Sequence, residues 1–381
     1  MATAARTRLR PTVAAALALT TAGAFALSAC GSSGGGAFGK GTQKTAEQSK
    51  APSDPKAQLA AGVDNLTAGS ALTSVFKYGG TEAQLTDIIK AQDPTLTASD
   101  MQGIKALTTG DLTFSVQAAA GKTLKQVQAD AKPGESNASF LIDYDGGPLV
   151  QLRTIGQDAY FQGDAKRILA LAKVSDAQAQ QTLAQLPPQY SFVKDAYAGK
   201  WLKVDAASLS TVQGQLKSLA GTAATPDATA QKQLIAQLQA ALSRDFTVTR
   251  KESTAKGDHL VLTAPLRSLA TDLTGVLAKL PGGATVTKSL DLSKVPDRPI
   301  IVDAYVKGTA LEELSLNVAQ FADPANPDDK ALVGKDLPIV IDFSSASVDI
   351  SAPATSTAVD LGALLKQFGG ALGGASAGST S

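Results

Sequence analysis

Few side chains in this 381-residue sequence belong to the types that carry out covalent or acid–base chemistry. There is one cysteine, Cys30, and one histidine, His259. Adjacent carboxylates occur at Glu312-Glu313 and at Asp328-Asp329, but neither pair belongs to a spaced series of oxygen ligands, so we expect both to be solvated. One thiol and one imidazole do not supply the ligands of a typical zinc site. We therefore predict no catalytic residue, no metal site and no cofactor, and a protein that is not an enzyme.

His259 lies in a stretch in which apolar and polar residues alternate. Because successive side chains of a strand point to opposite faces, His259 is expected on the face opposite Leu260 and Leu262. An exposed strand residue is the favoured interpretation, and a general base is the alternative. The phosphate-binding pattern Gly-x-x-x-x-Gly-Lys-Ser/Thr does not occur in the sequence, so nucleotide binding is not expected.

The residues before Cys30 have the layout of a secretory signal peptide. Arg6, Arg8 and Arg10 form a basic segment, and the run from Val13 to Leu27 is apolar and uncharged. This run is shorter than the roughly 20 residues of a membrane-spanning helix. Small residues and glycines follow it, so a permanent transmembrane helix is the weaker alternative.

The segment Leu27-Ser28-Ala29-Cys30-Gly31 resembles the bacterial lipobox, in which an apolar residue and two small residues precede a cysteine. That resemblance implies that the signal peptide, residues 1–29, is removed and that Cys30 becomes an acylated N-terminus. Burial of acyl chains contributes about 0.8 kcal/mol per CH₂, and two or more chains hold a protein durably on a membrane. We therefore expect a lipid anchor at Cys30 on the extracytoplasmic face of the cell membrane.

Two segments of low complexity flank the rest of the chain. Residues 30–55 are rich in Gly, Ser, Lys, Gln and Ala and are expected to form a flexible tether, whereas residues 369–381 are expected to be a disordered tail. Removing Arg6, Arg8 and Arg10 from the 35 basic side chains leaves 32 against 34 acidic ones. The mature chain therefore lacks the excess positive charge of a nucleic-acid-binding protein, and no nucleic-acid partner is expected.

Between these segments, two hydrophobic periods alternate, one typical of helices and one typical of half-buried strands, which indicates an α+β fold with an antiparallel sheet. Strands are predicted around Ala71–Tyr78, Leu112–Val116, Phe140–Tyr144, Val150–Leu152, Phe246–Val248, Leu260–Leu262, Ile300–Val306, Leu314–Val318, Ile339–Phe343 and Val348–Ile350. Helices are predicted over Gln58–Leu66, Thr81–Ala91, Ala98–Leu107, Ala165–Leu186, Ala206–Leu219, Ala228–Leu242, Pro265–Leu280 and Leu361–Phe368.

The strands form two groups, separated by the helical region between Ala165 and Leu242. Neither group contains enough helix to cover its own apolar face, and a sheet must bury that face against something. We therefore predict a single domain over residues 56–368. The sequence does not predict the oligomeric state.

Three short segments resemble a known family. VQLRTIGQDAYF from Val150 to Phe161, followed by GKWLKVD from Gly199 to Asp205, is similar to a signature of actinobacterial lipoproteins of the LppX/LprG type. Val348–Pro353 resembles the end of that family's last strand. The resemblance implies a LolA-like fold, in which a curved antiparallel sheet forms a half-barrel, helices cover its concave face, and an apolar cavity lies between them. It also implies the binding or carriage of acylated lipids in the cell envelope.

The apolar face of the predicted sheet, with two aromatic residues of the signature, supplies the candidate cavity-lining residues. They are Phe114, Val116, Phe140, Ile142, Val150, Leu152, Tyr160, Trp201, Phe246, Val248, Leu260, Leu262, Val302 and Leu316. For Trp201, the alternative interpretation is that its ring packs at the edge of the domain. An apolar stripe is consistent with a close-packed core as well as with an open cavity. We expect an acylated lipid or a lipoprotein as the ligand; the alternative is a non-catalytic interaction or sensory lipoprotein with a filled core.

Overall fold

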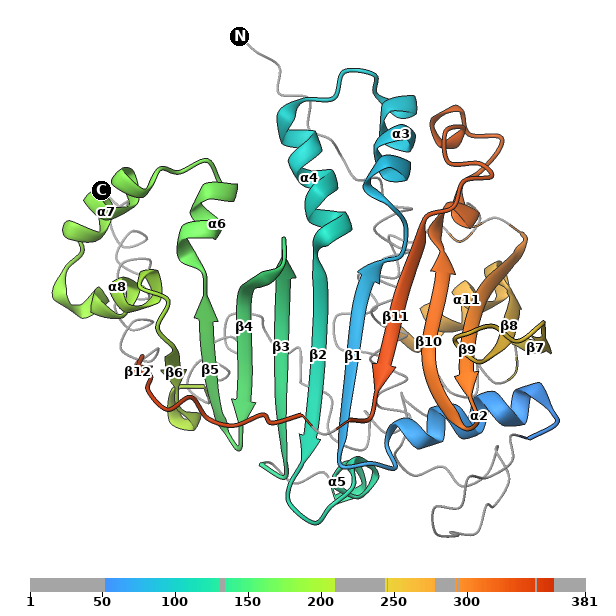
Figure 1. Ribbon diagram of the computed structural model, residues 1–381, viewed down its shortest axis with the longest axis horizontal. Helices are drawn as coiled ribbons and strands as arrows, with labels where there is room; N and C mark the ends of the chain where they lie inside the picture. The colour runs from blue at the N-terminus through green and yellow to red at the C-terminus, as the bar shows by residue number, and fades with distance from the viewer. Residues whose placement is uncertain are drawn as a thin grey trace, which may run out of the picture.

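The computed structural model describes residues 52–130, 134–209, 244, 246–277, 292, 295, 297–346 and 348–359 (Figure 1). Cys30, nearly all of the tether and the C-terminal tail lie outside the described residues. So do the predicted helices over Ala228–Leu242 and Leu361–Phe368, and most of the helix predicted from Ala206. The predictions for these segments stay predictions.

The strands of the described chain form one broad sheet in the order β12-β6-β5-β4-β3-β2-β1-β11-β10-β9-β8-β7 (Figure 1). Their bounds are β1 Ala71–Tyr78, β2 Asp111–Ala118, β3 Ser136–Tyr144, β4 Gly147–Ile155, β5 Asp158–Gly163, β6 Leu202–Val204, β7 Thr247–Arg250, β8 Asp258–Pro265, β9 Pro299–Lys307, β10 Ala310–Asn317, β11 Pro338–Ser344 and β12 Thr357–Ala358. Every pair is antiparallel except β6 with β12. The two predicted groups of strands are joined where β1 pairs with β11. The mixed α+β class and the antiparallel sheet are confirmed. The sheet is large and open, and the predicted curvature of a half-barrel stays a prediction.

The helices lie at the ends of the strands and on one face of the sheet (Figure 1). Their bounds are α2 Pro55–Leu66, α3 Glu82–Gln92, α4 Ala98–Thr109, α5 Leu124–Asp130, α6 Ala165–Leu171, α7 Asp176–Ala184, α8 Ser191–Tyr197 and α11 Leu266–Leu277, with short 3₁₀ turns at Pro188–Tyr190, Val318–Phe321 and Pro327–Asp329. Among the described residues, no helix combines the length and apolar character needed to cross a membrane.

Local sequence signals account for several element boundaries. Thr81 and Thr97 cap α3 and α4: each threonine hydroxyl accepts a hydrogen bond from the backbone amide of the third helical residue, and that residue's side chain accepts one from the threonine amide. Between β3 and β4, Asp145 and Gly146 both have positive φ, as a tight two-residue hairpin turn requires.

Two predicted elements are corrected. The helix predicted over Ala165–Leu186 is interrupted, because Lys173 adopts a left-handed conformation and Ser175 caps a new helix, α7. The strand predicted at Val348–Ile350 is absent; these residues form an extended connection between β11 and β12. Ile350 is 2% exposed, so burial against the sheet, rather than strand pairing, explains its apolar side chain.

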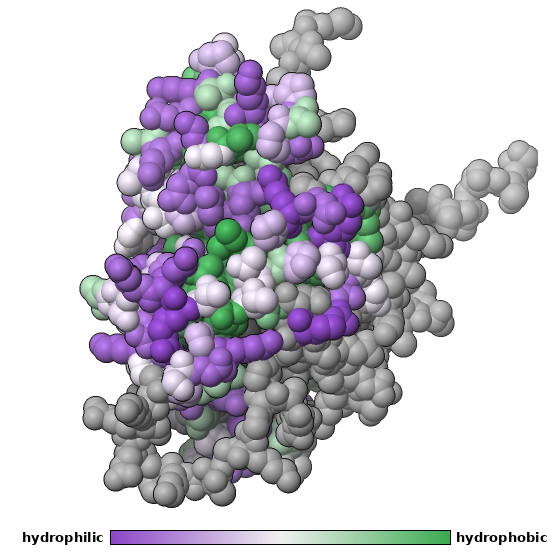
Figure 2. Space-filling model, turned by 90° about the vertical axis from the view of Figure 1, so that its right-hand side faces the viewer, coloured by the Kyte–Doolittle hydropathy of each residue, from purple (hydrophilic) through white to green (hydrophobic). Residues whose placement is uncertain are grey.

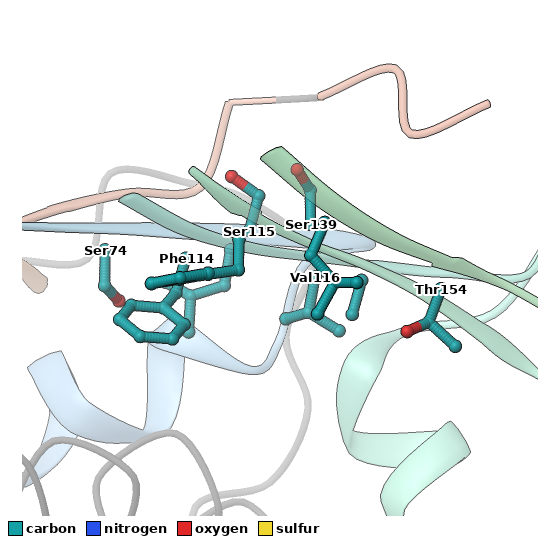
Figure 3. Close-up of a pocket in the computed structure, with 10 residues that line it drawn as sticks. Ser74, Phe114, Ser115, Val116, Ser139 and Thr154 are labelled. Atoms are coloured by element: carbon teal, nitrogen blue, oxygen red, sulfur yellow. The ribbon is translucent and has the colours of Figure 1, made fainter. Parts of the chain in front are cut away.

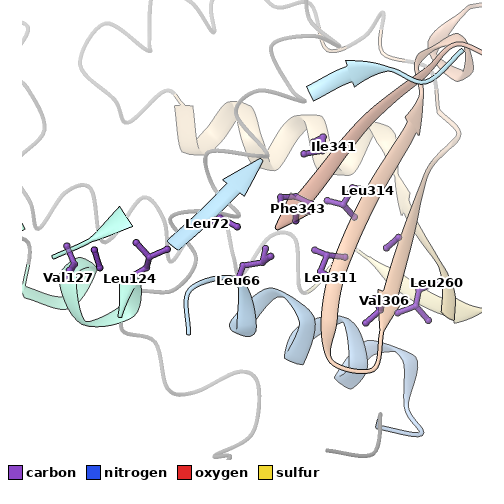
Figure 4. Packing of buried hydrophobic residues seen from close by; sticks show 12 residues of the cluster. Leu66, Leu72, Leu124, Val127, Leu260, Val306, Leu311, Leu314, Ile341 and Phe343 are labelled. Atoms are coloured by element: carbon purple, nitrogen blue, oxygen red, sulfur yellow. The ribbon is translucent and has the colours of Figure 1, made fainter. Parts of the chain in front are cut away.

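The strand register separates the side chains into two faces. We call the apolar face the one that carries Leu72, Phe114, Phe140, Leu152 and Leu314, and the polar face the one that carries their sequence neighbours. The main core lies on the apolar face, where side chains of α2 and α5 join those of β1, β8, β9, β10 and β11 (Figure 4). Among the described residues, those on the side seen in Figure 2 are mostly hydrophilic, with small hydrophobic patches between them.

A buried amide seats α2 on the sheet. Gln58 is 0% exposed, and its Nε2 donates to Asp258 Oδ2 at 2.8 Å and to the Gly308 carbonyl at 3.2 Å. Its Oε1 accepts a hydrogen bond of 2.6 Å from Arg250. Buried polar groups are costly when a partner is removed, so this amide is a structural joint between α2 and the hairpin β7–β8.

We predict that Gln58→Ala lowers the free energy of unfolding by about 1–3 kcal/mol, because it leaves buried partners unsatisfied. Urea unfolding followed by circular dichroism measures the change. Gln180→Ala is the matched control, since Gln180 is exposed and its Nε2 donates to Asp176 at the surface of α7, and it should change stability by less than about 0.5 kcal/mol. Equal effects of the two substitutions would contradict the assignment.

Candidate functional site

A cavity of about 210 Å³ lies on the apolar face over β1, β2, β3 and β4 (Figure 3). It is bordered by Leu72, Ser74, Phe114, Ser115, Val116, Ala138, Ser139, Phe140, Leu152 and Thr154. Phe114, Val116, Ser74 and Thr154 point to the cavity side, whereas Ser115 and Ser139 point to the polar face (Figure 3).

The register of the four strands creates this cavity. One row across the sheet reads Ser74, Phe114, Phe140, Leu152, and the next reads Leu72, Val116, Ala138, Thr154. The rings of Phe114 and Phe140 contact each other with centroids 4.7 Å apart. Small side chains at Ser74 and Ala138 stand beside these bulky ones, so the surface is hollowed instead of level. Phe114, Val116, Phe140 and Leu152 were predicted, whereas Leu72, Ser74, Ala138 and Thr154 were not.

The fourteen predicted lining residues fall into three groups. Phe114, Val116, Phe140 and Leu152 border the cavity, and Ile142 and Val150 lie on the same face in the adjacent row. Phe246, Val248, Leu260, Leu262, Val302 and Leu316 belong to packed clusters over β7 to β10. The predicted stripe is therefore a filled core over one half of the sheet and borders a hollow over the other half.

Tyr160 and Trp201 form the third group, and the structure does not bring them to the cavity. Tyr160 pairs with Arg153, on the polar face. The Arg153 guanidinium lies 4.7 Å from the centre of the Trp201 ring, and the Lys203 ammonium lies 5.7 Å from that of Tyr160. These contacts give the two aromatic rings a packing role at the edge formed by β4, β5 and β6.

The apolar rim of the cavity extends along the same face. Leu152 is 39% exposed, Leu112 37% and Phe161 38%, and all three lie on the apolar face of β4, β2 and β5. A second hollow, of about 420 Å³, lies where β8 ends and β9 begins, but Asp297 and Arg298 border it. Because charged groups resist burial beneath an apolar ligand, the first cavity is the better candidate for one.

The residues considered for chemistry lie on the polar face. His259 is opposite Leu260, as predicted, but it is half-buried: its Nε2 lies 2.7 Å from Asp303 Oδ1 and its ring stacks on Tyr305 at 5.0 Å. Glu313 is also not solvated, since it is 7% exposed and paired with Lys256 at 2.6 Å, whereas Glu312 is exposed.

His259 and Glu313 each have a partner on the polar face: Asp303 lies within hydrogen-bonding distance of His259, and Lys256 forms an ion pair with Glu313. The pairing of β9 with β10 is irregular between Leu311 and Glu313. This irregularity turns the side chain of Glu313 toward the polar face. In the part of the chain that the structure describes, no group of three or more His, Cys, Asp or Glu side chains could hold a metal ion.

No family model matches the sequence, and no curated protein matches it. Among solved structures, a likeness is found to the crystal structure of the Mycobacterium tuberculosis lipoprotein LppX. It has 9% sequence identity, covers 78% of this chain and 97% of that chain, and has a TM-score of 0.27. At that identity and TM-score the likeness establishes neither a family nor a function for this chain.

The row of charges on the polar face includes one carboxyl whose ionisation works against folding. Burial raises the pKa of Asp111 above its ordinary value of 3.8; Lys77 opposes this shift and Asp143 and Asp342 add to it. The native protein therefore holds this proton more tightly than the unfolded chain, and stability is lost as pH rises from about 3.8 through the raised pKa.

We predict that Asp111→Asn stabilises the protein at pH 7 and has no stabilising effect at pH 3, where the carboxyl is protonated in both the native and the unfolded state. Thermal midpoints of both proteins across this pH range test the prediction. Asp64→Asn, at an exposed position of α2, is the control for removing one negative charge. A pH-independent effect of Asp111→Asn would contradict burial as the cause.

Proposed function

We propose that this protein is an exported, lipid-anchored envelope protein that binds an acyl chain in the cavity on the apolar face of β1 to β4. The observation that carries the proposal is the cavity itself, bordered by aromatic and aliphatic side chains on one half of a sheet whose other half is packed. The proposal does not include catalysis.

The dimensions of the cavity favour a hydrocarbon chain over a whole lipid. Its 210 Å³ correspond to roughly seven water volumes, less than the usual pocket for a drug-sized ligand. Each buried CH₂ contributes about 0.8 kcal/mol, so part of a fatty-acyl chain gains enough to bind. Leu112, Leu152 and Phe161 offer an apolar path beyond the cavity for the rest of a longer chain.

Two hydroxyl groups supply the polar part of the recognition. Ser74 and Thr154 border the cavity from β1 and β4 and point to the same side as Phe114 and Val116 (Figure 3). An ester or carboxyl oxygen at either end of the hollow could accept a hydrogen bond from these side chains. The ligand class is therefore an acyl chain with a polar end, as in a fatty acid or an acylated lipid.

The alternative, a non-catalytic interaction or sensory protein, draws on the packed clusters over β7 to β10. In that case the hollow over β1 to β4 would take no ligand. Filling the hollow by substitution separates the two functions, because only the acyl-binding function requires it to be open.

Ala138→Trp is predicted to abolish binding of a fluorescent long-chain fatty acid, because the indole would fill the cavity from its floor. Ala138 is exposed and borders the cavity, so the larger side chain has room and the fold should persist. Fluorescence titration of the mature chain gives the affinity, and circular dichroism verifies folding.

Ala310→Trp is the matched control, since Ala310 is an exposed strand residue on the half of the sheet away from the cavity. It should bind the fatty acid as the parent does. Acyl binding that survives in Ala138→Trp, or that is absent from the parent protein, would reject the proposed site; the latter result would favour the interaction protein.

The anchor has its own test, because Cys30 lies outside the described residues. We predict that intact-mass analysis of the membrane fraction shows a chain that begins at residue 30 and carries acyl groups on Cys30. Cys30→Ser should release the protein from membranes, since no acyl chain would then be buried. An unmodified Cys30 in the membrane-bound protein would contradict the anchor.

A further inference from the structure

The connection between β11 and β12 crosses the polar face directly behind the cavity. We call residues 348–356 the strap; it runs in front of β2 to β5 and ends at the far edge of the sheet, where β12 pairs with β6 (Figure 1). The strap therefore joins the middle of the sheet to the edge of its cavity-bearing half.

A row of small hydroxyl side chains lies on the polar face, which the strap crosses. Thr73, Ser115 and Ser139 are directly paired across β1, β2 and β3, and the first two share a hydrogen bond of 3.0 Å. Ser115 and Ser139 point toward the strap (Figure 3). Short side chains allow the strap to lie close to the sheet, and Ile350 is consequently 2% exposed.

Three polar side chains of the sheet form hydrogen bonds with the backbone of the strap. Gln117 Oε1 accepts from the Ile350 amide at 3.3 Å, and Asn137 Nδ2 donates to the Ile350 carbonyl at 3.0 Å. Arg153 donates to the Ser351 carbonyl at 2.9 Å while its guanidinium packs over Trp201. The far end is held by Thr357, whose amide donates to the Trp201 carbonyl at 2.8 Å.

Each of these three side chains belongs to a residue that is next in sequence to one that borders the cavity. Gln117 follows Val116, Asn137 precedes Ala138, and Arg153 lies between Leu152 and Thr154. Neighbours along a strand point to opposite faces of the same backbone, so each residue that binds the strap shares its backbone segment with a residue that borders the cavity. The strap and the cavity floor thus share three strands, β2, β3 and β4.

From this juxtaposition we infer that the strap is a clasp: when it is seated on the polar face, it holds β2, β3 and β4 in the arrangement that forms the cavity on the other face. Acyl affinity then depends on whether the strap is seated, which rests on the proposed function. Fixing a binding surface before the ligand arrives strengthens binding by lowering the cost of ordering it.

The test uses the mature chain with Cys30→Ser and Ser115→Cys, so that the only thiol lies on the polar face, which the strap crosses. Two variants unseat the strap. Gln117→Ala with Asn137→Ala removes two hydrogen bonds from the sheet to the backbone of Ile350, and Ile350→Ser removes the buried apolar side chain of the strap itself. Gln320→Ala is the control, because Gln320 grips the backbone of Ile301 on β9 in the same way.

Both unseating variants should increase the rate of thiol labelling about tenfold, because losing hydrogen bonds or a buried side chain shifts the strap toward its open state. They should also weaken fatty-acid binding about tenfold and accelerate hydrogen exchange in β2, β3 and β4. Gln320→Ala should leave all three quantities within about twofold of the parent, because it does not alter the equilibrium of the strap.

An unchanged rate of thiol labelling in the unseating variants would overturn the clasp. The clasp would also be overturned if labelling became faster while hydrogen exchange in β2, β3 and β4 and the affinity for the fatty acid both stayed unchanged. If the mature chain that carries only Cys30→Ser binds no fatty acid, the proposed function fails, and hydrogen exchange alone decides the clasp. Faster exchange in the unseated variants then supports it, and unchanged exchange overturns it.

Discussion

The pairing of β1 with β11 is the constraint on which the rest of the structure depends. It joins the strands between Ala71 and Val204 to those between Thr247 and Ser344, so that they belong to one sheet. Six residue pairs from Thr73–Ser344 to Tyr78–Ile339 set a single register across this joint. Because side chains alternate along each strand, that register decides which residues of distant segments share a face.

Both halves of the apolar face have apolar residues at alternate positions, but one half is packed and the other borders a cavity. Around β8 to β11, α2 covers the face, and Leu66, Leu311 and Leu314 are all buried in one cluster. Over β1 to β4, small residues in the cross-strand rows leave a hollow beside Phe114 and Phe140. The difference comes from side-chain volume at particular positions and from where a helix is placed, since both halves have apolar residues at alternate positions.

The polar face joins distant parts of the chain through ion pairs and the strap. Lys256 reaches Glu313 on β10, and Lys77 of β1 pairs with Asp342 of β11, so charges follow the same register as the apolar residues behind them. The strap adds a second connection between the middle and the edge of the sheet. A sheet that carries a cavity on one face is therefore supported on the other.

Much of the site could be predicted, and the exceptions have physical causes. Phe114, Val116, Phe140 and Leu152 were found from alternation, because a half-buried strand needs an apolar residue at every second position. Ser74 and Ala138 were missed, since small residues carry no hydrophobic signal until their neighbours across the sheet are known. Tyr160 and Trp201 were placed with the cavity from a resemblance, whereas strand parity puts them on the other face.

By itself the sequence determined the local features: the helix caps at Thr81 and Thr97, the turn at Asp145-Gly146, the alternation of most strands and the signal-like segment before Cys30. These depend on residues close together in the chain, whose backbone preferences act locally. Only the tertiary structure decided that both strand groups form one sheet, that half of the apolar face is filled, and that Val348–Ile350 is a strap instead of a strand. Those outcomes depend on contacts between residues far apart in sequence, and local patterns carry no information about such partners.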